Sequence, residues 1–199
     1  MEPNVPSVAE KFEHIKRLIS KGFPVSHIVV RIDPIMPYYL VDTIDKTFMI
    51  DYIAKIKNIL AMTESIGIQR VRYSYLDEFD FFKQDLKKMF VGFYSSNKNY
   101  IQDYRLDLKK LNPNLHYESC AEPLSPDDDR FGCISVIDLD ILDIKRKMDL
   151  VYPELNMFPT PCRCPLNKRE LILHEHGFEC SFGCIYCYWR AYEHKRPCK

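Results

Sequence analysis

The stretch SVAEKFEHIKRLISKGFPVSHIVVRIDP, residues 7–34, contains one complete helix-to-strand unit. Ser7 followed by Glu10 forms a capping-box pattern, and Gly22 suits the end of a helix. Apolar residues recur between them at helical spacing, at Val8, Phe12, Ile15, Leu18 and Ile19. The following run HIVVRIDP is typical of a buried parallel strand. We expect this strand to stop at Pro34, because proline has no backbone N–H to donate to a neighbouring strand.

The same unit recurs along the chain. Residues 46–66 predict a helix that ends at Gly67, with one apolar side formed by Ile50, Ile53, Ile56, Leu60 and Met62. We expect strands in IQRVRYSYLD, residues 68–77, and LHYESCAEP, residues 115–123, and helices over 78–92, 99–111 and 136–148. This alternation predicts an α/β fold with a parallel sheet. Three strands are too few for an eight-stranded barrel, so we expect a partial (β/α) barrel-like sheet.

The chain changes character near residue 150. The stretch VYPELNMFPTPCRCPLNK, residues 151–168, has four prolines and no clear periodicity, and a cysteine-rich end follows it. We therefore expect an α/β body over residues 1–149 and an irregular, cysteine-rich, metal-binding segment over residues 150–199. Frequent apolar and aromatic residues in this segment favour packing against the body over a disordered tail.

The overall composition favours neither a nucleic-acid nor a membrane partner, although a local basic patch is compatible with it. The 199 residues include 28 Lys plus Arg and 28 Asp plus Glu, so the chain as a whole has no field that favours nucleic acid or membranes. No apolar run approaches the roughly 20 residues that span a bilayer, and no signal peptide is visible. We expect a cytoplasmic protein. Its eight cysteines are then better interpreted as metal ligands and buried thiols than as a disulfide framework.

Polar residues lie at the ends of the three predicted strands. Ligands of parallel α/β folds bind beyond the C-terminal ends of strands, so these residues are candidates for a site. The site could bind a polar substrate, move protons or hold an amino-acid-like cofactor group. The alternative is a buried Arg–Asp pair that closes a turn, with a small buried thiol beside it. The residues concerned are Arg31, Asp33, Tyr75, Asp77, Cys120 and Glu122.

Three cysteines near the C-terminus have the spacing C-x3-C-x2-C, at Cys180, Cys184 and Cys187. Neighbouring thiolates need a cation to neutralise them. Structural zinc takes four ligands, and Cys162 with Cys164 could complete such a set with Cys184 and Cys187. Three cysteines on one loop instead suit a [4Fe–4S] cluster with one iron left for a small molecule. We favour the cluster and keep zinc as the alternative. Cys133 is interpreted as a buried thiol.

The cysteine loop CSFGCIYCYW, residues 180–189, is similar to the CxxxCxYCY loop of radical S-adenosylmethionine enzymes and of spore photoproduct lyase. Over nearly its whole length the chain resembles domain-of-unknown-function family 1848. The segments that carry this resemblance, in order, are MEPNVPS, VVRIDPI, ESCAEP, FGCISVIDLDIL, CRCP and CSFGCIYCYW.

The resemblance implies a cluster on Cys180, Cys184 and Cys187, with Tyr186 assigned to the cofactor. S-adenosylmethionine would be a small-molecule cofactor, and the similarity to a DNA-repair enzyme makes a nucleic-acid or nucleotide substrate an expectation. Because the loop lies near the end of the chain, cofactor contacts must come from the preceding strands, at Arg31, Asp33, Asp77 and Glu122. Family members begin with about a third of a barrel upstream of EPNVPS. We therefore expect a shortened or split member, in which a separate chain completes the barrel.

Overall fold

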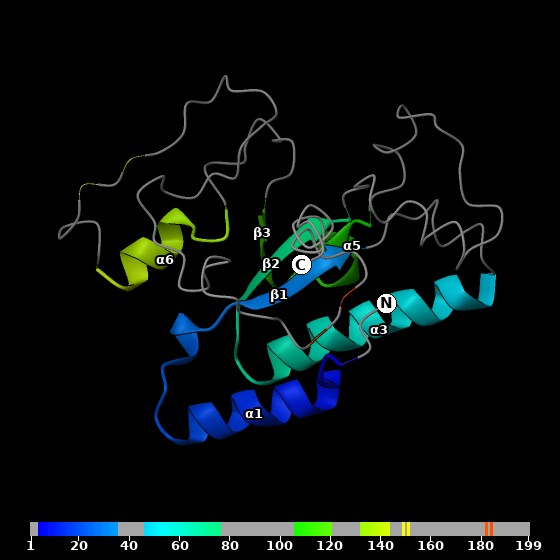
Figure 1. Cartoon of the computed structure of the whole chain (residues 1–199), viewed down its shortest axis with the longest axis horizontal. Coiled ribbons are helices and arrows are strands. Elements are labelled where there is room, and N and C mark those ends of the chain that lie inside the picture. Colours follow the sequence, from blue (N-terminus) through cyan, green and yellow to red (C-terminus); the bar gives the residue numbers. More distant parts are fainter. Residues whose placement is uncertain are drawn as a thin grey trace, which may run out of the picture.

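The computed structural model describes residues 4–35, 46–76, 106–120 and 132–143, and the single positions 149, 151, 182 and 184. These residues form an α/β structure with a three-stranded parallel sheet, as predicted (Figure 1). The described elements are α1 (Val8–Ser20), η1 (Val25–His27), β1 (Val30–Ile35), α3 (Lys46–Ser65), β2 (Arg70–Tyr75), α5 (Leu108–Leu111), β3 (His116–Ser119) and α6 (Val136–Ile141).

The first helix begins and ends where the sequence predicts. The Ser7 hydroxyl accepts a hydrogen bond from the Glu10 N–H at 3.2 Å, and the Ser7 N–H donates to the Glu10 carboxylate at 2.8 Å. Gly22 follows the helix with a φ of 90°, a conformation that costs glycine nothing. The apolar stripe is less buried than its spacing suggests, since Phe12 is the buried residue of α1 and Leu18 is exposed.

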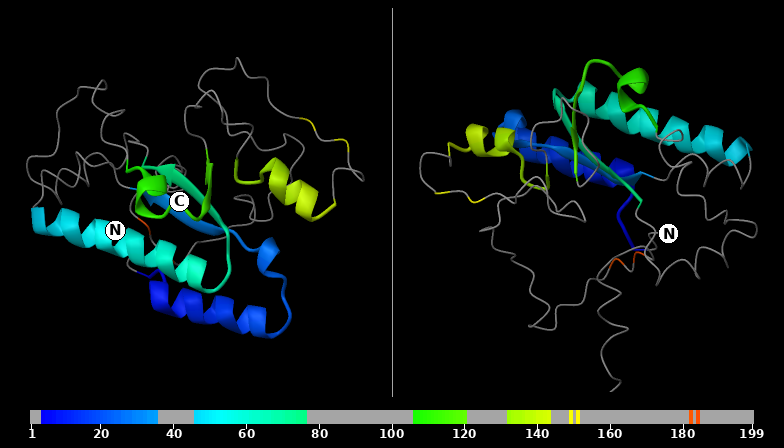
Figure 2. Two further views of the ribbon diagram at one scale, coloured as in Figure 1. Left: turned by 180° about the vertical axis from the view of Figure 1, so that it is seen from behind. Right: turned by 90° about the horizontal axis from the view of Figure 1, so that it is seen from above.

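The strands run in the order β1-β2-β3, with β2 in the middle. Val30 aligns with Val71 and Arg31 with Arg72, and Arg72 in turn aligns with Glu118. Figure 1 and Figure 2 show α1 and α3 on the same side of the sheet, both running in the opposite direction to β1. The N-terminal end of α1 therefore lies at the end of the structure where the parallel strands finish.

The expectation that β1 stops at Pro34 is wrong. The strand continues to Ile35, and its register with β2 shifts between Ile32 and Ile35. Proline has no backbone N–H to donate to a neighbouring strand. It is tolerated where the pairing of two strands is irregular. The shift lets Ile32 and Ile35 both face the core although they are three residues apart.

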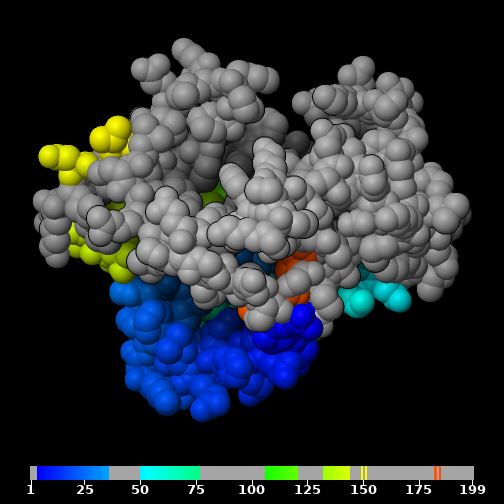
Figure 3. All heavy atoms as spheres, viewed as in Figure 1, coloured from blue at the N-terminus to red at the C-terminus, as the bar shows by residue number. Residues whose placement is uncertain are grey.

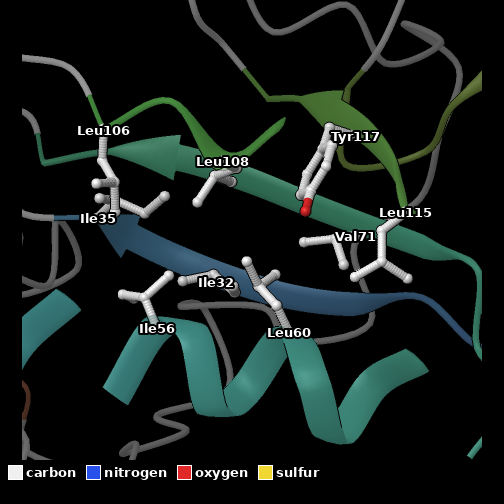
Figure 4. Close-up of a cluster of buried hydrophobic side chains, with 9 residues drawn as sticks. All are labelled: Ile32, Ile35, Ile56, Leu60, Val71, Leu106, Leu108, Leu115 and Tyr117. Carbon is white, nitrogen blue, oxygen red and sulfur yellow. The ribbon is translucent and has the colours of Figure 1, made fainter. Parts of the chain in front are cut away.

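One face of the sheet forms the hydrophobic core against α3 (Figure 4). Ile56 and Leu60 of α3 belong to this core together with Val71 of the central strand, and Leu60 and Val71 are completely buried. The helix ends before Gly67, which has a φ of 84°. Ile50, expected on the apolar side of this helix, is 64% exposed. The remaining core residues are Ile32, Ile35, Leu106, Leu108, Leu115 and Tyr117.

Two further helices are shorter than predicted within the described residues. The helix predicted over residues 99–111 is not continuous near its C-terminal end. There α5 covers Leu108–Leu111, and its N-cap residue Asp107 has an extended backbone. The Asp107 side chain accepts a hydrogen bond from the Lys110 N–H, and this cap fixes the start of the helix. Of the helix predicted over 136–148, α6 forms the part Val136–Ile141. Among the described residues, no helix is long and apolar enough to cross a membrane.

Candidate functional site

The face of the sheet opposite α3 carries polar side chains from all three strands. Successive residues of a strand point to opposite faces, so the neighbours of the core residues Ile32, Val71 and Tyr117 face away from the core. These outward-facing residues, which we call the polar face, are Arg31, Asp33, Arg70, Arg72, Ser74, Glu118 and Cys120.

A buried ion-pair network occupies the middle of the polar face. Glu118 is completely buried and lies between two arginines of the central strand. Arg70 Nε donates to Glu118 Oε1 at 2.6 Å, and Arg72 Nε donates to Glu118 Oε2 at 3.2 Å. Both guanidinium groups also bind Asp138 of α6, at 2.6 Å from Arg70 and 2.9 Å from Arg72. The positive charges of Arg70 and Arg72 are therefore balanced by the negative charges of Glu118 and Asp138.

Residues at the start of α6 form hydrogen bonds with the same network. The Ser135 side chain caps α6 by accepting from the Asp138 N–H at 3.3 Å, and it also accepts from Arg70 Nη2 at 3.1 Å. The Ser135 N–H donates to Asp138 Oδ2 at 2.8 Å. Arg72 Nη1 donates to the carbonyl oxygen of Cys133 at 2.7 Å. These bonds hold residues 133–138 over the polar face.

The charged forms of Glu118, Asp138 and Arg70 are favoured by their neighbours. Burial would raise the pKa of Glu118, but hydrogen bonds and charge from Arg70 and Arg72 lower it below its ordinary value. The pKa of Asp138 is lowered in the same way, against burial, by the Ser135 N–H and both arginines. Burial disfavours the charge of Arg70, yet Glu118 and Asp138 raise its pKa. A carboxylate held ionised in this way is a poor general base, so we assign the network a structural role.

Beside the buried network, Arg31 of β1, which aligns with Arg72, forms an ion pair with Asp33, two residues further along the same strand. The Ser74 hydroxyl of β2 donates to the other oxygen of the Asp33 carboxylate. The side chains of Arg31 and Asp33 are 41% and 32% exposed, so this pair is open to solvent, unlike the buried network. Burial would lower the pKa of Arg31, but Asp33 and Cys133 together raise it. A partly exposed guanidinium of this kind could bind a carboxylate or phosphate.

Two thiols meet beside this pair. Cys120 follows β3 and Cys133 precedes α6, and their Sγ atoms are 3.3 Å apart. Cys120 is buried whereas Cys133 is exposed, so the interpretation of Cys133 as a buried thiol is wrong. The Cys133 side chain also hydrogen-bonds to Arg31. No local pattern predicted that these thiols would meet, because the two cysteines come from different elements.

Part of the cysteine loop is described. The Asn4 N–H donates to the carbonyl oxygen of Phe182 at 3.3 Å, and Cys184 is a partly exposed thiol. Figure 3 shows atoms of this segment, in orange, beside the dark-blue N-terminal part of α1. Phe182 therefore lies beside the chain just before α1, at the end of the structure where the strands finish.

Tyr75, another predicted site residue, packs against the apolar core, and its Oη donates to the carbonyl oxygen of Leu106 at 3.0 Å. The remaining predicted site residues lie outside the described residues. They are Asp77, Glu122, Cys162, Cys164, Cys180, Tyr186 and Cys187. Within the described ranges, no group of three or more His, Cys, Asp or Glu side chains is placed to hold a metal ion. The structure thus pairs Arg31 with Asp33, but the pair is partly exposed and is not the buried pair of the alternative interpretation. The cysteine ligand sets stay predictions.

The sequence interpretation missed the buried network completely. The sequence feature that points to the network is the alternation of charged and apolar residues in Arg70-Val71-Arg72, within a stretch otherwise typical of a buried strand. Charged residues are rarely fully buried unless they are paired, so this pattern indicates a partner carboxylate on a neighbouring strand. Glu118 occupies the matching position in β3.

No curated protein and no solved structure matches the chain. The model of one protein family, described as "Domain of unknown function (DUF1848)", matches residues 1–189. This match covers nearly the whole chain, and it spans the described sheet, the polar face and the cysteine loop. The protein therefore belongs to the DUF1848 family.

Proposed function

We propose that this protein is an iron–sulfur protein of the radical S-adenosylmethionine type. The observation that carries the proposal is the C-x3-C-x2-C spacing of Cys180, Cys184 and Cys187, with Tyr186 directly before the last cysteine. Three thiolates on one short loop suit a cluster that keeps one iron open. Closed tetrahedral zinc would require a fourth protein ligand.

The described part of the loop supports this proposal. Cys184 is a thiol that is partly exposed, so it is accessible to a metal centre. The hydrogen bond between Asn4 and Phe182 ties the loop to the start of α1. Because α1 runs antiparallel to β1, this attachment brings Phe182 to the end of the sheet where parallel α/β proteins bind ligands.

Residues of the polar face would bind the cofactor or substrate in the proposed site. When bound, the cluster would supply one electron for reductive cleavage of S-adenosylmethionine. Arg31 would bind the carboxylate of that cofactor or an anionic group of the substrate, because its guanidinium is partly exposed and stays charged. Asp33, fixed by the Ser74 hydroxyl, would orient Arg31 and accept a hydrogen bond from an amino group.

We further propose a partial barrel as the scaffold. In a (β/α) barrel the helices lie outside and the opposite faces of the strands line the interior. The described sheet has α3 on its apolar face and charged residues on the other, which is the pattern expected of a barrel wall. Further strands, from this chain or from a separate one, would complete the enclosure.

Metal analysis of protein purified without air tests the proposal. We expect close to four irons and four sulfides per chain after reconstitution. Cys180→Ala should lose this iron, whereas Cys198→Ala, a cysteine outside the motif, should keep it. A colourless protein with one zinc and no sulfide would contradict the cluster. That result would favour the alternative, a zinc module on Cys162, Cys164, Cys184 and Cys187.

Cofactor binding needs a separate measurement. Adding S-adenosylmethionine to the reduced, reconstituted protein should change the electron paramagnetic resonance spectrum of the cluster, since a ligand would bind its open iron. Arg31→Gln should weaken this response, and Arg17→Gln, on the exposed surface of α1, should not. An unchanged spectrum at saturating cofactor would limit the function to iron–sulfur binding. Single-stranded DNA or nucleotides added in the same assay would probe the substrate class.

A further inference from the structure

We propose that Cys120 and Cys133 form a redox-active dithiol, a site separate from the cysteine loop and independent of any cluster. Their Sγ atoms are 3.3 Å apart, and both residues are thiols in the structure. A disulfide bond has a length of about 2.0 Å, so the two sulfur atoms need to approach by about 1.3 Å. The exposed side chain of Cys133 can make this movement by rotating toward the buried Cys120.

The surroundings give the two thiols different roles. Cys133 is exposed and its side chain hydrogen-bonds to the Arg31 guanidinium, and a neighbouring cation favours the thiolate, which is the nucleophile. Cys120 is only 5% exposed, so a reagent from solvent reaches it poorly. Cys133 is therefore the attacking thiol and Cys120 the resolving thiol.

The position of Cys133 is fixed by the buried network rather than by its own side chain. Arg72 donates to its carbonyl oxygen at 2.7 Å, and Ser135, two residues later, caps α6 and binds Arg70. Cys120 is held from the other side, because its N–H donates to the carbonyl oxygen of Tyr73 at 2.8 Å. The backbone on both sides of the pair is thus anchored to the sheet, which keeps the two sulfur atoms close.

Charge argues against a metal ion at this pair. Arg31 contacts Cys133 directly, and the Arg72 guanidinium binds the backbone of the same residue. Two neighbouring cations repel a metal ion, whereas they stabilise the thiolate and the negative charge that passes between sulfur atoms during exchange. Asp33 offsets part of this charge through its ion pair with Arg31.

The reaction needs an oxidant, and we propose a low-molecular-weight disulfide such as oxidised glutathione. The Cys133 thiolate attacks one glutathione sulfur, the glutathione S–S bond breaks, and one reduced glutathione leaves. The Cys120 thiolate then attacks Cys133 Sγ in the mixed disulfide and releases the second reduced glutathione. Two protein thiols lose two electrons and two protons, and one glutathione disulfide becomes two glutathione thiols.

Tryptic peptide mapping can identify this bond without ambiguity. Cleavage after Lys110, Arg130 and Lys145 gives peptides 111–130 and 131–145, which contain Cys120 and Cys133 respectively and no other cysteine. The full chain, folded and reduced, is equilibrated with oxidised glutathione, blocked with iodoacetamide and digested. We expect the two peptides linked to each other. Cys133 linked to glutathione or to a different cysteine, with Cys120 alkylated, would overturn the proposal.

The variants separate the two roles. Cys120→Ser should stop at the mixed disulfide and accumulate glutathione on Cys133, while Cys133→Ser should leave Cys120 unmodified. Cys198→Ser is the control and should form the linked peptides like the parent protein. Cys120→Ala repeats the measurement if serine disturbs the buried position. Glutathione on Cys120 in the Cys133 variant, or a mixed disulfide that does not accumulate in either Cys120 variant, would overturn the assignment.

Arg31 supplies a further test, which a merely structural pair would fail. Arg31→Gln should slow alkylation of Cys133 by iodoacetamide at neutral pH by up to about tenfold, because one unit of thiol pKa changes the thiolate fraction about tenfold. Arg31→Lys should restore most of the rate, and Arg17→Gln should not change it. Equal rates in the Arg31→Gln variant and the parent protein would exclude Arg31 as the activating cation.

Discussion

The two faces of the sheet hold their covering elements by different forces. On one face, α3 packs aliphatic side chains such as Ile56 and Leu60 against the sheet, and the gain in free energy comes from removing apolar surface from water. On the other, α6 is held by Asp138, which binds Arg70 and Arg72, and these bonds require defined partners and angles.

The difference has a consequence for function. An apolar interface tolerates substitution by side chains of similar volume, whereas a buried charge must keep its partners. Each charged residue of the polar face therefore needs its particular partner. This precision positions Cys133 next to Cys120 and Arg31, at the edge of the network that solvent can reach. The apolar face supports the sheet, and the polar face carries the groups that can take part in chemistry.

Removing the central carboxylate should have the largest effect. Glu118→Ala leaves two buried arginines short of negative charge, and we expect a loss of about 3–5 kcal/mol in the free energy of unfolding. Urea denaturation of the reduced protein measures this loss. Glu13→Ala, which removes an exposed carboxylate that pairs with Lys16, is the matched control and should give no resolvable change. A similar, small change in both variants would show that the network does not hold the fold.

A cavity in the apolar face should have a comparable or somewhat smaller effect. Leu60→Ala removes a completely buried side chain, and we expect a loss of about 2–5 kcal/mol in the same urea measurement. Ile50→Ala on the same helix is the control, because Ile50 is 64% exposed. Equal losses in the two variants would contradict the core described between α3 and the sheet.

Acid should weaken the polar face selectively. The pKa values of Glu118 and Asp138 are lowered in the folded protein, so the unfolded chain binds protons at a higher pH than the folded one. Stability should therefore fall as the pH drops below the ordinary values of 4.5 and 3.8 and toward the folded pKa values. The effect should be smaller than that of Glu118→Ala, because a protonated carboxyl keeps its volume and still forms hydrogen bonds.

Thermal unfolding followed by circular dichroism between pH 3 and pH 6 measures this dependence. Glu118→Gln, which carries no titratable group at this position, should show a flatter profile than the parent protein. A parallel decline in both proteins would assign the acid sensitivity to other carboxylates.

The smallest effect is expected from removing the hydroxyl of Tyr117, which lies on the apolar face. Tyr117 Oη donates to the carbonyl oxygen of Asn112 at 2.7 Å, and Tyr117→Phe should cost about 1 kcal/mol in urea denaturation. Burial raises the pKa of Tyr117 to about 12 from an ordinary value of 10.0. The parent protein should therefore lose stability as the pH rises from 10 toward 12. Tyr117→Phe should lack this part of the decline, and an identical alkaline profile would contradict the hydrogen bond.

Local patterns in the sequence predicted the described elements well. The capping box at Ser7 fixed the start of α1, and Gly67 marked the end of α3, because both signals act through neighbouring backbone atoms. Errors arose where distant contacts decide. Pro34 did not end β1, since a register shift against β2 accommodates it, and Ile50 fits the helical spacing but is exposed.

The same distinction between local patterns and distant contacts applies to the candidate site. The spacing of Arg31 and Asp33 on alternate positions of one strand placed them on one face, and the structure pairs them. Glu118 was not predicted as a partner of Arg70, because 48 residues separate them in the sequence. The cysteine ligand sets stay predictions that rest on their spacing alone.

Short-range backbone geometry is encoded locally, so the order of the described helices and strands and the alternation of Arg31 and Asp33 along β1 could be derived from the chain alone. The cysteine spacing on which the proposed cluster depends is likewise a property of the sequence. Long-range contacts are different: the fold had to be known to see that Glu118 neutralises Arg70 and Arg72, and that Cys133 reaches Cys120 beside Arg31. These contacts depend on strand register and on how residues 132–143 cover the sheet, and no local pattern in the chain encodes either.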